Sequence, residues 1–146
     1  MNKEALEFLK KERVGVLSVE MMDGSPHGAT VHYAHTEDPL IFYFETYRDY
    51  RKAEPLFGRE KTRASFVVGS DESNMKTLQL DGEVELLKEE ELDNFKKLYF
   101  YEKFPEKIEK MESGDINFVF FKFTPTWWRF TDWTTPKGKM IWSSED

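Results

Sequence analysis

Residues 40–52 read LIFYFETYRDYRK, a strongly apolar segment followed by a polar and basic one. The first seven residues are apolar on both faces, which predicts a strand that is covered on both sides. The hydroxyl of Thr46 and the cations of Arg48, Arg51 and Lys52 follow where this strand ends and a short helix begins. Hydroxyl, guanidinium and ammonium donors beside a helix start suit a phosphate dianion. The same residues also fit a solvated basic turn.

The segments on either side predict a mainly β fold of the α+β class. Short β-branched or aromatic runs predict further strands, and amphipathic or capped stretches predict helices. The expected strands are residues 14–20, 27–35, 63–69, 75–87, 116–123 and 127–133, and the expected helices are residues 2–12, 49–57 and 89–104. Hairpin-length connections favour an antiparallel sheet, and Gly82 suggests a bulge or bend within it. Closing such a sheet into a barrel removes its edges. We expect one domain over residues 1–146, with a loose tail from about residue 136.

Composition excludes several classes of protein. The chain has 146 residues, no cysteine and a net charge of −7. Disulfides, Cys-ligated metals and thiol catalysis are therefore excluded. The acidic balance does not favour binding to nucleic acid or to an anionic membrane. No apolar run approaches the roughly 20 residues that span a bilayer, and the charged first residues do not resemble a secretory signal. We therefore expect a cytoplasmic protein.

No metal site and no hydrolytic motif is expected. His27 and His35 have the same parity on the expected strand, whereas His32 has the other, so the three histidines do not converge on one ion. The sequence has no Gly-x-Ser-x-Gly elbow and no glycine-rich nucleotide motif.

The ordered segments VGVLSVE, DGSPHGATVHYAH, LIFYFETYRDYRKAEPL, KTRASFVVG, LQLDGEVELL and FKFTP resemble the pyridoxamine 5′-phosphate oxidase-like superfamily of FMN-binding split barrels. The resemblance extends over residues 6–126. Its most specific element is a strand that ends in Thr46 and is followed by the pair Arg51 and Lys52 at the start of a helix. It implies a six-stranded antiparallel split β-barrel with peripheral helices, which works as a homodimer with FMN between the subunits.

The resemblance also implies roles for individual residues. Thr46 would meet the phosphate or the ribityl chain, and Arg51 and Lys52 would bind the phosphate. Thr77 or Gln79 would contact the flavin of the partner subunit. The residues that would run along the flavin ring, largely through backbone groups, are Thr30, Val31, His32, Tyr33 and His35. Tyr50 stands where many relatives have a serine, which removes one hydroxyl that could bind phosphate.

The activity implied is flavin-mediated redox of an unknown small molecule, with His35 and Tyr33 as candidate catalytic proton donors, besides His32. True pyridoxamine-phosphate oxidases have an arginine before the proline that ends the long helix and a closing Arg-x-His element. Both are missing here, so we do not expect that reaction. The alternatives are a non-enzymatic flavin- or heme-binding protein, a deazaflavin-dependent reductase, and a ligand-free interaction module.

The most individual segment is residues 126–133, TWWRFTDW. Trp128 and Arg129 could line the substrate side of the flavin, since an indole stacks on planar rings and a guanidinium binds acids. Alternation along a strand would place these two on opposite faces. Trp127, Trp128 and Trp133 could equally pack the barrel or serve a dimer interface.

Overall fold

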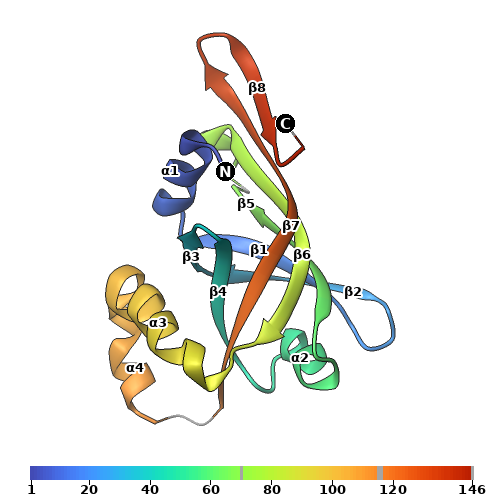
Figure 1. Ribbon diagram of the computed structural model, residues 1–146, viewed down its shortest axis with the longest axis vertical. Helices are drawn as coiled ribbons and strands as arrows, with labels where there is room; N and C mark the ends of the chain where they lie inside the picture. The colour runs from blue at the N-terminus through green and yellow to red at the C-terminus, as the bar shows by residue number, and fades with distance from the viewer. Residues whose placement is uncertain (70, 115–116, 146) are drawn as a thin grey trace.

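The computed structural model describes residues 1–69, 71–114 and 117–145. Within them, eight strands form one curled antiparallel sheet in the order β2-β1-β5-β6-β7-β4-β3, and β8 pairs with β7 (Figure 1). The strands are β1 (Val14–Glu20), β2 (Pro26–His32), β3 (Ala34–Glu37), β4 (Leu40–Tyr47), β5 (Thr62–Val68), β6 (Lys76–Leu86), β7 (Phe118–Thr135) and β8 (Gly138–Ser143). This mainly β architecture confirms the expected split-barrel class, although the sheet has eight strands where six were expected.

Short helical segments lie around the sheet (Figure 1). They are α1 (Lys3–Lys11), η1 (Arg51–Ala53), α2 (Glu54–Gly58), η2 (Glu72–Asn74), η3 (Glu89–Glu91), α3 (Leu92–Lys96), η4 (Lys97–Lys103), η5 (Pro105–Lys107) and α4 (Ile108–Glu112). Asn2 caps α1 by accepting a hydrogen bond from the backbone of Ala5, so the cap expected from the sequence is confirmed. None of the described helices is long and apolar enough to cross a membrane.

Residues 27–35 do not form the single strand that was expected. The strand breaks at Tyr33, so β2 pairs with β1 while β3 pairs with β4. The Tyr33 ring is fully buried, and its hydroxyl donates a hydrogen bond to the Leu9 carbonyl over 2.7 Å. This anchor in the core marks the point where the chain leaves one part of the sheet for another. Because of this break, His27 and His35 lie on different strands, and the rule that alternate residues share a face no longer relates them.

The last part of the chain also differs from expectation. The two strands expected around Thr124-Pro125 form one continuous strand, β7. Its pairing with β6 continues past the proline because the register shifts between Asp81 and Gly82, and Gly82 lies opposite Pro125. This shift confirms the irregularity expected at Gly82. The expected loose tail instead contains β8, which extends a hairpin from β7 (Figure 1). Trp142 of β8 stacks on the buried ring of Phe130, with the centroids 5.8 Å apart, and this contact fixes the hairpin.

Residues 89–104, expected as one helix, fold as η3, α3 and the π-helix η4. The wide π turn lets the adjacent residues Tyr99 and Phe100 both pack inward, against Phe95 and Phe104. These rings form a second apolar cluster against the outer side of β4. The cluster positions Tyr99, Lys103 and Lys107 next to the sheet.

Candidate functional site

A cavity of about 200 Å³ lies at the end of β4. We call it the Thr46 pocket, and its lining residues are Thr30, Val31, His32, Glu45, Thr46, Tyr47, Tyr50, Lys52, Tyr99 and Lys107. Five of the residues predicted from the sequence therefore lie together: three from β2, Thr46 from β4 and Lys52 from η1. The pocket forms because β2 passes beside the end of β4, where the chain turns into η1.

Thr46 and Lys52 supply two buried donor groups to this pocket. Thr46 is only 4% exposed, and its hydroxyl oxygen makes no hydrogen bond to any residue that the structure describes. Lys52 is 8% exposed, and its ammonium lies 4.7 Å from the centre of the Tyr50 ring. Burial lowers the pKa of Lys52, and the charge of Glu45 opposes this shift. An anion in the pocket would offset the cost of burying both groups.

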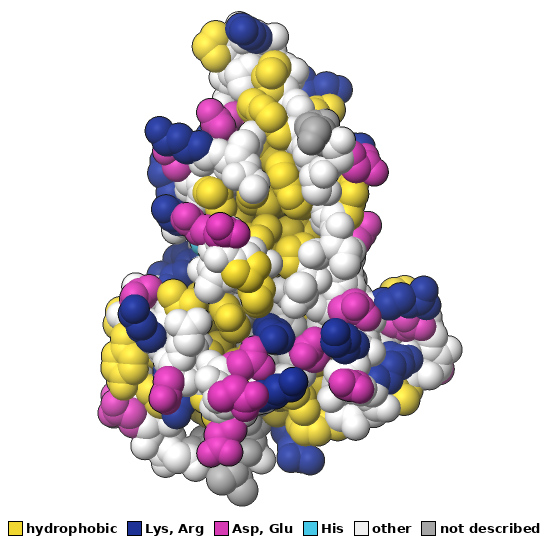
Figure 2. Space-filling model, in the orientation of Figure 1, with side chains coloured by type: hydrophobic (Ala, Val, Ile, Leu, Met, Phe, Trp, Pro, Cys, Tyr) yellow, Lys and Arg dark blue, Asp and Glu magenta, His cyan; other side chains and the backbone are white. Residues whose placement is uncertain are grey.

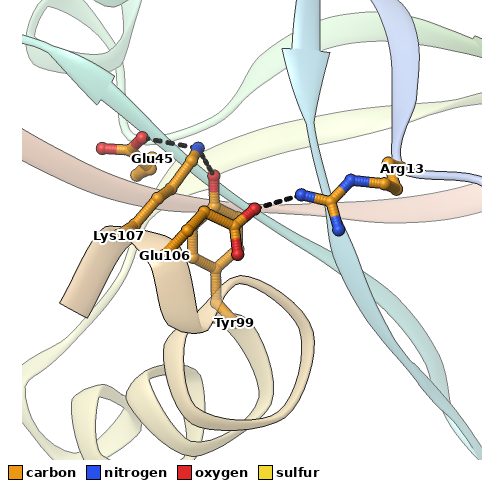
Figure 3. Close-up of polar contacts among 5 residues, drawn as sticks. All are labelled: Arg13, Glu45, Tyr99, Glu106 and Lys107. Carbon is orange, nitrogen blue, oxygen red and sulfur yellow. Dashed lines mark hydrogen bonds and ion pairs between the residues drawn. The ribbon is translucent and has the colours of Figure 1, made fainter.

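Lys107 adds a second cation at the wall of the pocket (Figure 3). Its ammonium donates hydrogen bonds to Glu45 Oε1 over 3.0 Å and to the Tyr99 hydroxyl over 2.9 Å. Burial raises the pKa of Tyr99, and the charge of Glu45 raises it further, so the phenol stays neutral. Among the described residues of the lining, the one carboxylate is thus already paired with a lysine, and Lys52 is the cation without an acidic partner.

His32 completes the pocket on the side of Phe104, with the two ring centres 4.8 Å apart. The guanidinium of Arg13 lies over the same phenyl ring and forms an ion pair with Glu106 (Figure 3). Burial lowers the pKa of His32, and the charges of Lys107 and Arg13 lower it further. The imidazole is therefore neutral at neutral pH, with one nitrogen that donates a hydrogen bond and one that accepts.

The basic residues of the segment 46–52 separate in the structure. Arg51 is exposed and does not line the Thr46 pocket, whereas the neighbouring Lys52 is buried there. The guanidinium of Arg48 lies over the Phe57 ring at 4.3 Å, and Arg48 does not line the pocket. Of the three cations expected around Thr46, Lys52 lines the pocket of this chain and Arg48 and Arg51 do not.

Tyr33 and His35 do not join the Thr46 pocket. The Tyr33 phenol is a core group bonded to α1, and burial raises its pKa, so the structure does not support it as a proton donor to a ligand. His35 lies in a separate cavity between β3 and η4. The family resemblance implied that both residues lie beside the flavin, and in this chain the strand break at Tyr33 separates them from residues 30–32.

The remaining predicted residues lie along β6 and β7, away from the Thr46 pocket. Thr77 lines a groove of about 380 Å³ together with Met75 and Trp133. Gln79 is exposed and pairs across the ladder with Arg129, which is also exposed. Trp128 packs against the core. The expectation that Trp128 and Arg129 occupy opposite faces is confirmed.

Four wall residues of the Thr46 pocket were not predicted from the sequence: Glu45, Tyr47, Tyr99 and Lys107. Glu45 stands beside the predicted Thr46, so its position at the end of the strand was a usable signal. Tyr99 and Lys107 are more than 50 positions further along the chain. Only the packing of η4 against β4 brings them to the pocket, and no local pattern could have indicated it.

Comparison with known proteins agrees with this architecture. Residues 1–132 match the family described as pyridoxamine 5′-phosphate oxidase. No curated protein matches the chain.

Solved structures with the same fold include the following three. A protein related to general stress protein 26, from Clostridium acetobutylicum, is 15% identical, with a TM-score of 0.65 over 97% of this chain and 93% of that one. A heme binding protein from Mycobacterium smegmatis is 14% identical, with a TM-score of 0.70 over 99% and 60%. The heme storage protein HutZ from Vibrio cholerae is 15% identical, with a TM-score of 0.65 over 84% and 87%. Since the family match spans nearly the whole chain, the protein belongs to the pyridoxamine 5′-phosphate oxidase family.

Proposed function

We propose that the protein binds FMN and that the Thr46 pocket holds its phosphate. The observation that carries this proposal is the buried hydroxyl of Thr46, which has no hydrogen-bond partner among the described residues. The buried ammonium of Lys52 lines the same cavity. A phosphate dianion accepts hydrogen bonds from both groups, so the residues present fit this part of the cofactor. Arg51, which is exposed and directly precedes Lys52, would bind the phosphate from the solvent side.

The rest of the flavin would extend along β2, where the backbone of residues 30–32 borders the pocket. Bound FMN would supply hydride or electron transfer to a small molecule. The neutral imidazole of His32 is then the side chain placed to give or take a proton at the pocket wall. We infer an oxidoreductase whose substrate differs from pyridoxamine 5′-phosphate, because the arginines typical of that substrate site are missing.

We also propose that the protein is a homodimer. Thr77, Gln79 and Arg129 do not line the pocket of their own chain, and we propose that they contact the flavin of a partner. Met75, which directly precedes β6, Trp133 of β7 and Ile141 of β8 are between 44% and 51% exposed. Figure 2 shows hydrophobic side chains gathered along the middle of the sheet face, flanked by charges. Such an apolar band favours burial against another subunit.

Heme is the second candidate ligand. Two of the solved structures with this fold are a heme binding and a heme storage protein. His32 offers a neutral imidazole, which is the form that ligates iron. A deazaflavin would use the same phosphate-binding groups as FMN, so the Thr46 pocket does not discriminate between these two cofactors.

The absorbance spectrum of the purified protein, taken before and after addition of FMN and desalting, tests the proposal. Retained flavin bands support it, and a Soret band would instead identify heme. A colourless protein that does not retain added FMN would contradict it.

The Thr46→Val variant makes the test specific to the pocket. Valine keeps the volume of threonine, and the lost hydroxyl makes no hydrogen bond within the described chain, so folding is preserved. We expect about tenfold weaker FMN binding, the effect of one lost hydrogen bond to a charged group. Thr124→Val, at an exposed position of β7, is the matched control. Equal affinity in the two variants would refute the phosphate assignment.

A further inference from the structure

A second cavity of about 210 Å³ lies between β3 and η4. We call it the His35 cavity. His35 and Lys103 line it together with the apolar side chains of Ala34 and Leu98. It shares no lining residue with the Thr46 pocket, so a ligand here would be independent of the proposed flavin.

Two buried nitrogen atoms of this cavity lack hydrogen-bond partners. His35 Nε2 and Lys103 Nζ are both inaccessible to solvent, and neither makes a hydrogen bond to any part of the chain that the structure describes. Both side chains lie against the Tyr33 ring. Lys103 Nζ is 3.7 Å from its centre, and the His35 ring centre is 6.1 Å away. The contact with Tyr33 occupies one side of the ammonium and leaves its N–H groups without acceptors.

The charges around these two nitrogens leave them without an acidic partner. Burial lowers the pKa of Lys103 to about 7, the charge of Arg13 adds to this shift, and Glu12 opposes it. Burial also lowers the pKa of His35 to about 4, with Lys103 and Lys10 adding to the shift and Glu37 opposing it. Glu37 is 2.8 Å from Lys10 and is therefore already paired. Glu102 is exposed at the rim of the cavity.

We propose that the His35 cavity binds a small organic carboxylate. Rotation of the His35 and Lys103 side chains would turn Nε2 and Nζ, which are buried in the free protein, into the cavity, where they donate hydrogen bonds to its oxygens. Its short apolar tail would pack against Ala34 and Leu98. Two donors from two side chains match the two oxygens of a carboxylate. A phosphate dianion fits less well, because Glu37 and Glu102 at the rim repel a second negative charge.

Binding is coupled to proton uptake. The carboxylate favours the ammonium form of Lys103, so its pKa rises on binding and the complex takes up a proton at pH values above about 7. Affinity therefore falls as the pH rises above neutral. This proton uptake distinguishes a carboxylate held by Lys103 from an apolar molecule that simply fills the cavity.

The experiment uses sodium butyrate as the probe and the full chain as the protein. Butyrate binding is followed by NMR chemical shifts, and proton uptake by calorimetry in two buffers of different ionisation enthalpy. For so small a ligand we expect a Kd of about 1 mM. Lys103→Met should weaken binding about tenfold or more and abolish the proton uptake, because it removes the charge-assisted bond. His35→Gln should weaken binding to a smaller extent.

Two variants control the experiment. Lys97→Met, at an exposed position of the same π-helix, should bind butyrate like the wild type. Thr46→Val should also leave butyrate binding unchanged, so a failure of the flavin proposal would not affect this test. Thermal melting of Lys103→Met shows whether the variant is folded, and His35→Gln provides an independent test if it is not.

Three outcomes would overturn the proposal. In the first, butyrate causes no shifts in the wild type. In the second, n-butanol binds as tightly as butyrate, or Lys103→Met binds butyrate with full affinity. Either result would mean that the cavity binds the apolar tail and not the carboxylate. In the third, inorganic phosphate competes with butyrate and binds more tightly, which would assign the cavity to phosphate.

Discussion

Lys107 of η5 donates a hydrogen bond of 3.0 Å to the carboxylate of Glu45 on β4, across 62 positions of the chain (Figure 3). Both side chains are mostly buried, with 20% and 13% of their surfaces exposed. The pair ties the helical segment to the sheet beside the Thr46 pocket. In this pair the positive charge of Lys107 and the negative charge of Glu45 offset each other at the pocket wall. Neutralising either side chain by mutation would therefore change the electrostatic potential at a bound anion.

We predict that Glu45→Gln strengthens FMN binding. The amide still accepts the hydrogen bond from Lys107, while the loss of the negative charge leaves the ammonium uncompensated beside the phosphate. Unit charges about 4 Å apart interact by about 1 kcal/mol at the dielectric constant of water and by more where water is partly excluded, so a gain of about fivefold or more in affinity is expected. Lys107→Met should weaken binding by a similar factor. Quenching of flavin fluorescence measures both, and a weaker complex with Glu45→Gln would contradict the assignment.

Tyr33→Phe tests whether this tyrosine is a core group or a ligand group. The variant loses the buried hydrogen bond to the Leu9 carbonyl, which should lower the free energy of unfolding by about 1–2 kcal/mol. FMN affinity should not change. Urea unfolding and flavin titration give the two quantities, and Tyr101→Phe, which alters an exposed phenol, is the control. Unchanged stability with weakened flavin binding would restore Tyr33 as a cofactor ligand.

The buried imidazole of His35 should make the free energy of unfolding depend on pH. Its pKa is about 4 in the folded protein, where burial is the main cause, and close to 6.5 in the unfolded chain. Between these values the unfolded chain binds more protons, so the free energy of unfolding falls as the pH drops from 6.5 towards 4. The loss from this residue should reach about 3 kcal/mol.

His35→Gln should remove this part of the pH dependence. Urea unfolding of both proteins at several pH values gives the difference between their curves, which isolates His35 from the carboxylates. A constant difference over this pH range would show that His35 titrates normally and is accessible to water.

Gly69 and Gly24 provide a matched pair of backbone substitutions. Both have positive φ angles, +93° and +85°, which side chains disfavour. A Cβ at Gly69 would lie 2.3 Å from the Lys76 carbonyl oxygen and 2.8 Å from the Phe8 ring, whereas a Cβ at Gly24 would meet nothing within 4 Å. We expect Gly24→Ala to cost about 1 kcal/mol and Gly69→Ala about 2–4 kcal/mol. Equal costs, measured by chemical denaturation, would mean that the loop after β5 relaxes away from α1.

Local patterns predicted much of the fold because their causes lie within a few residues. Asn2 caps α1 through a backbone group three positions away, and the turn cluster after residue 20 makes the β1–β2 hairpin. Gly82 marks the register shift because a side chain there would collide with the Thr124 carbonyl. Thr46 and Lys52 come together because they are only six positions apart at the end of one strand. The sequence by itself therefore determined the mainly β class and the centre of the candidate site.

The tertiary structure alone decided which distant groups join that centre. Lys107 reaches Glu45 only because the aromatic rings of η4 pack against β4, and the buried anchor of Tyr33 sends His35 to a different cavity from His32. Arg51 and Lys52 are adjacent in sequence, yet only Lys52 is buried in the pocket. Periodicity records which side chains share a face. Which faces then meet depends on the packing of large rings from remote segments, and no local pattern encodes that packing.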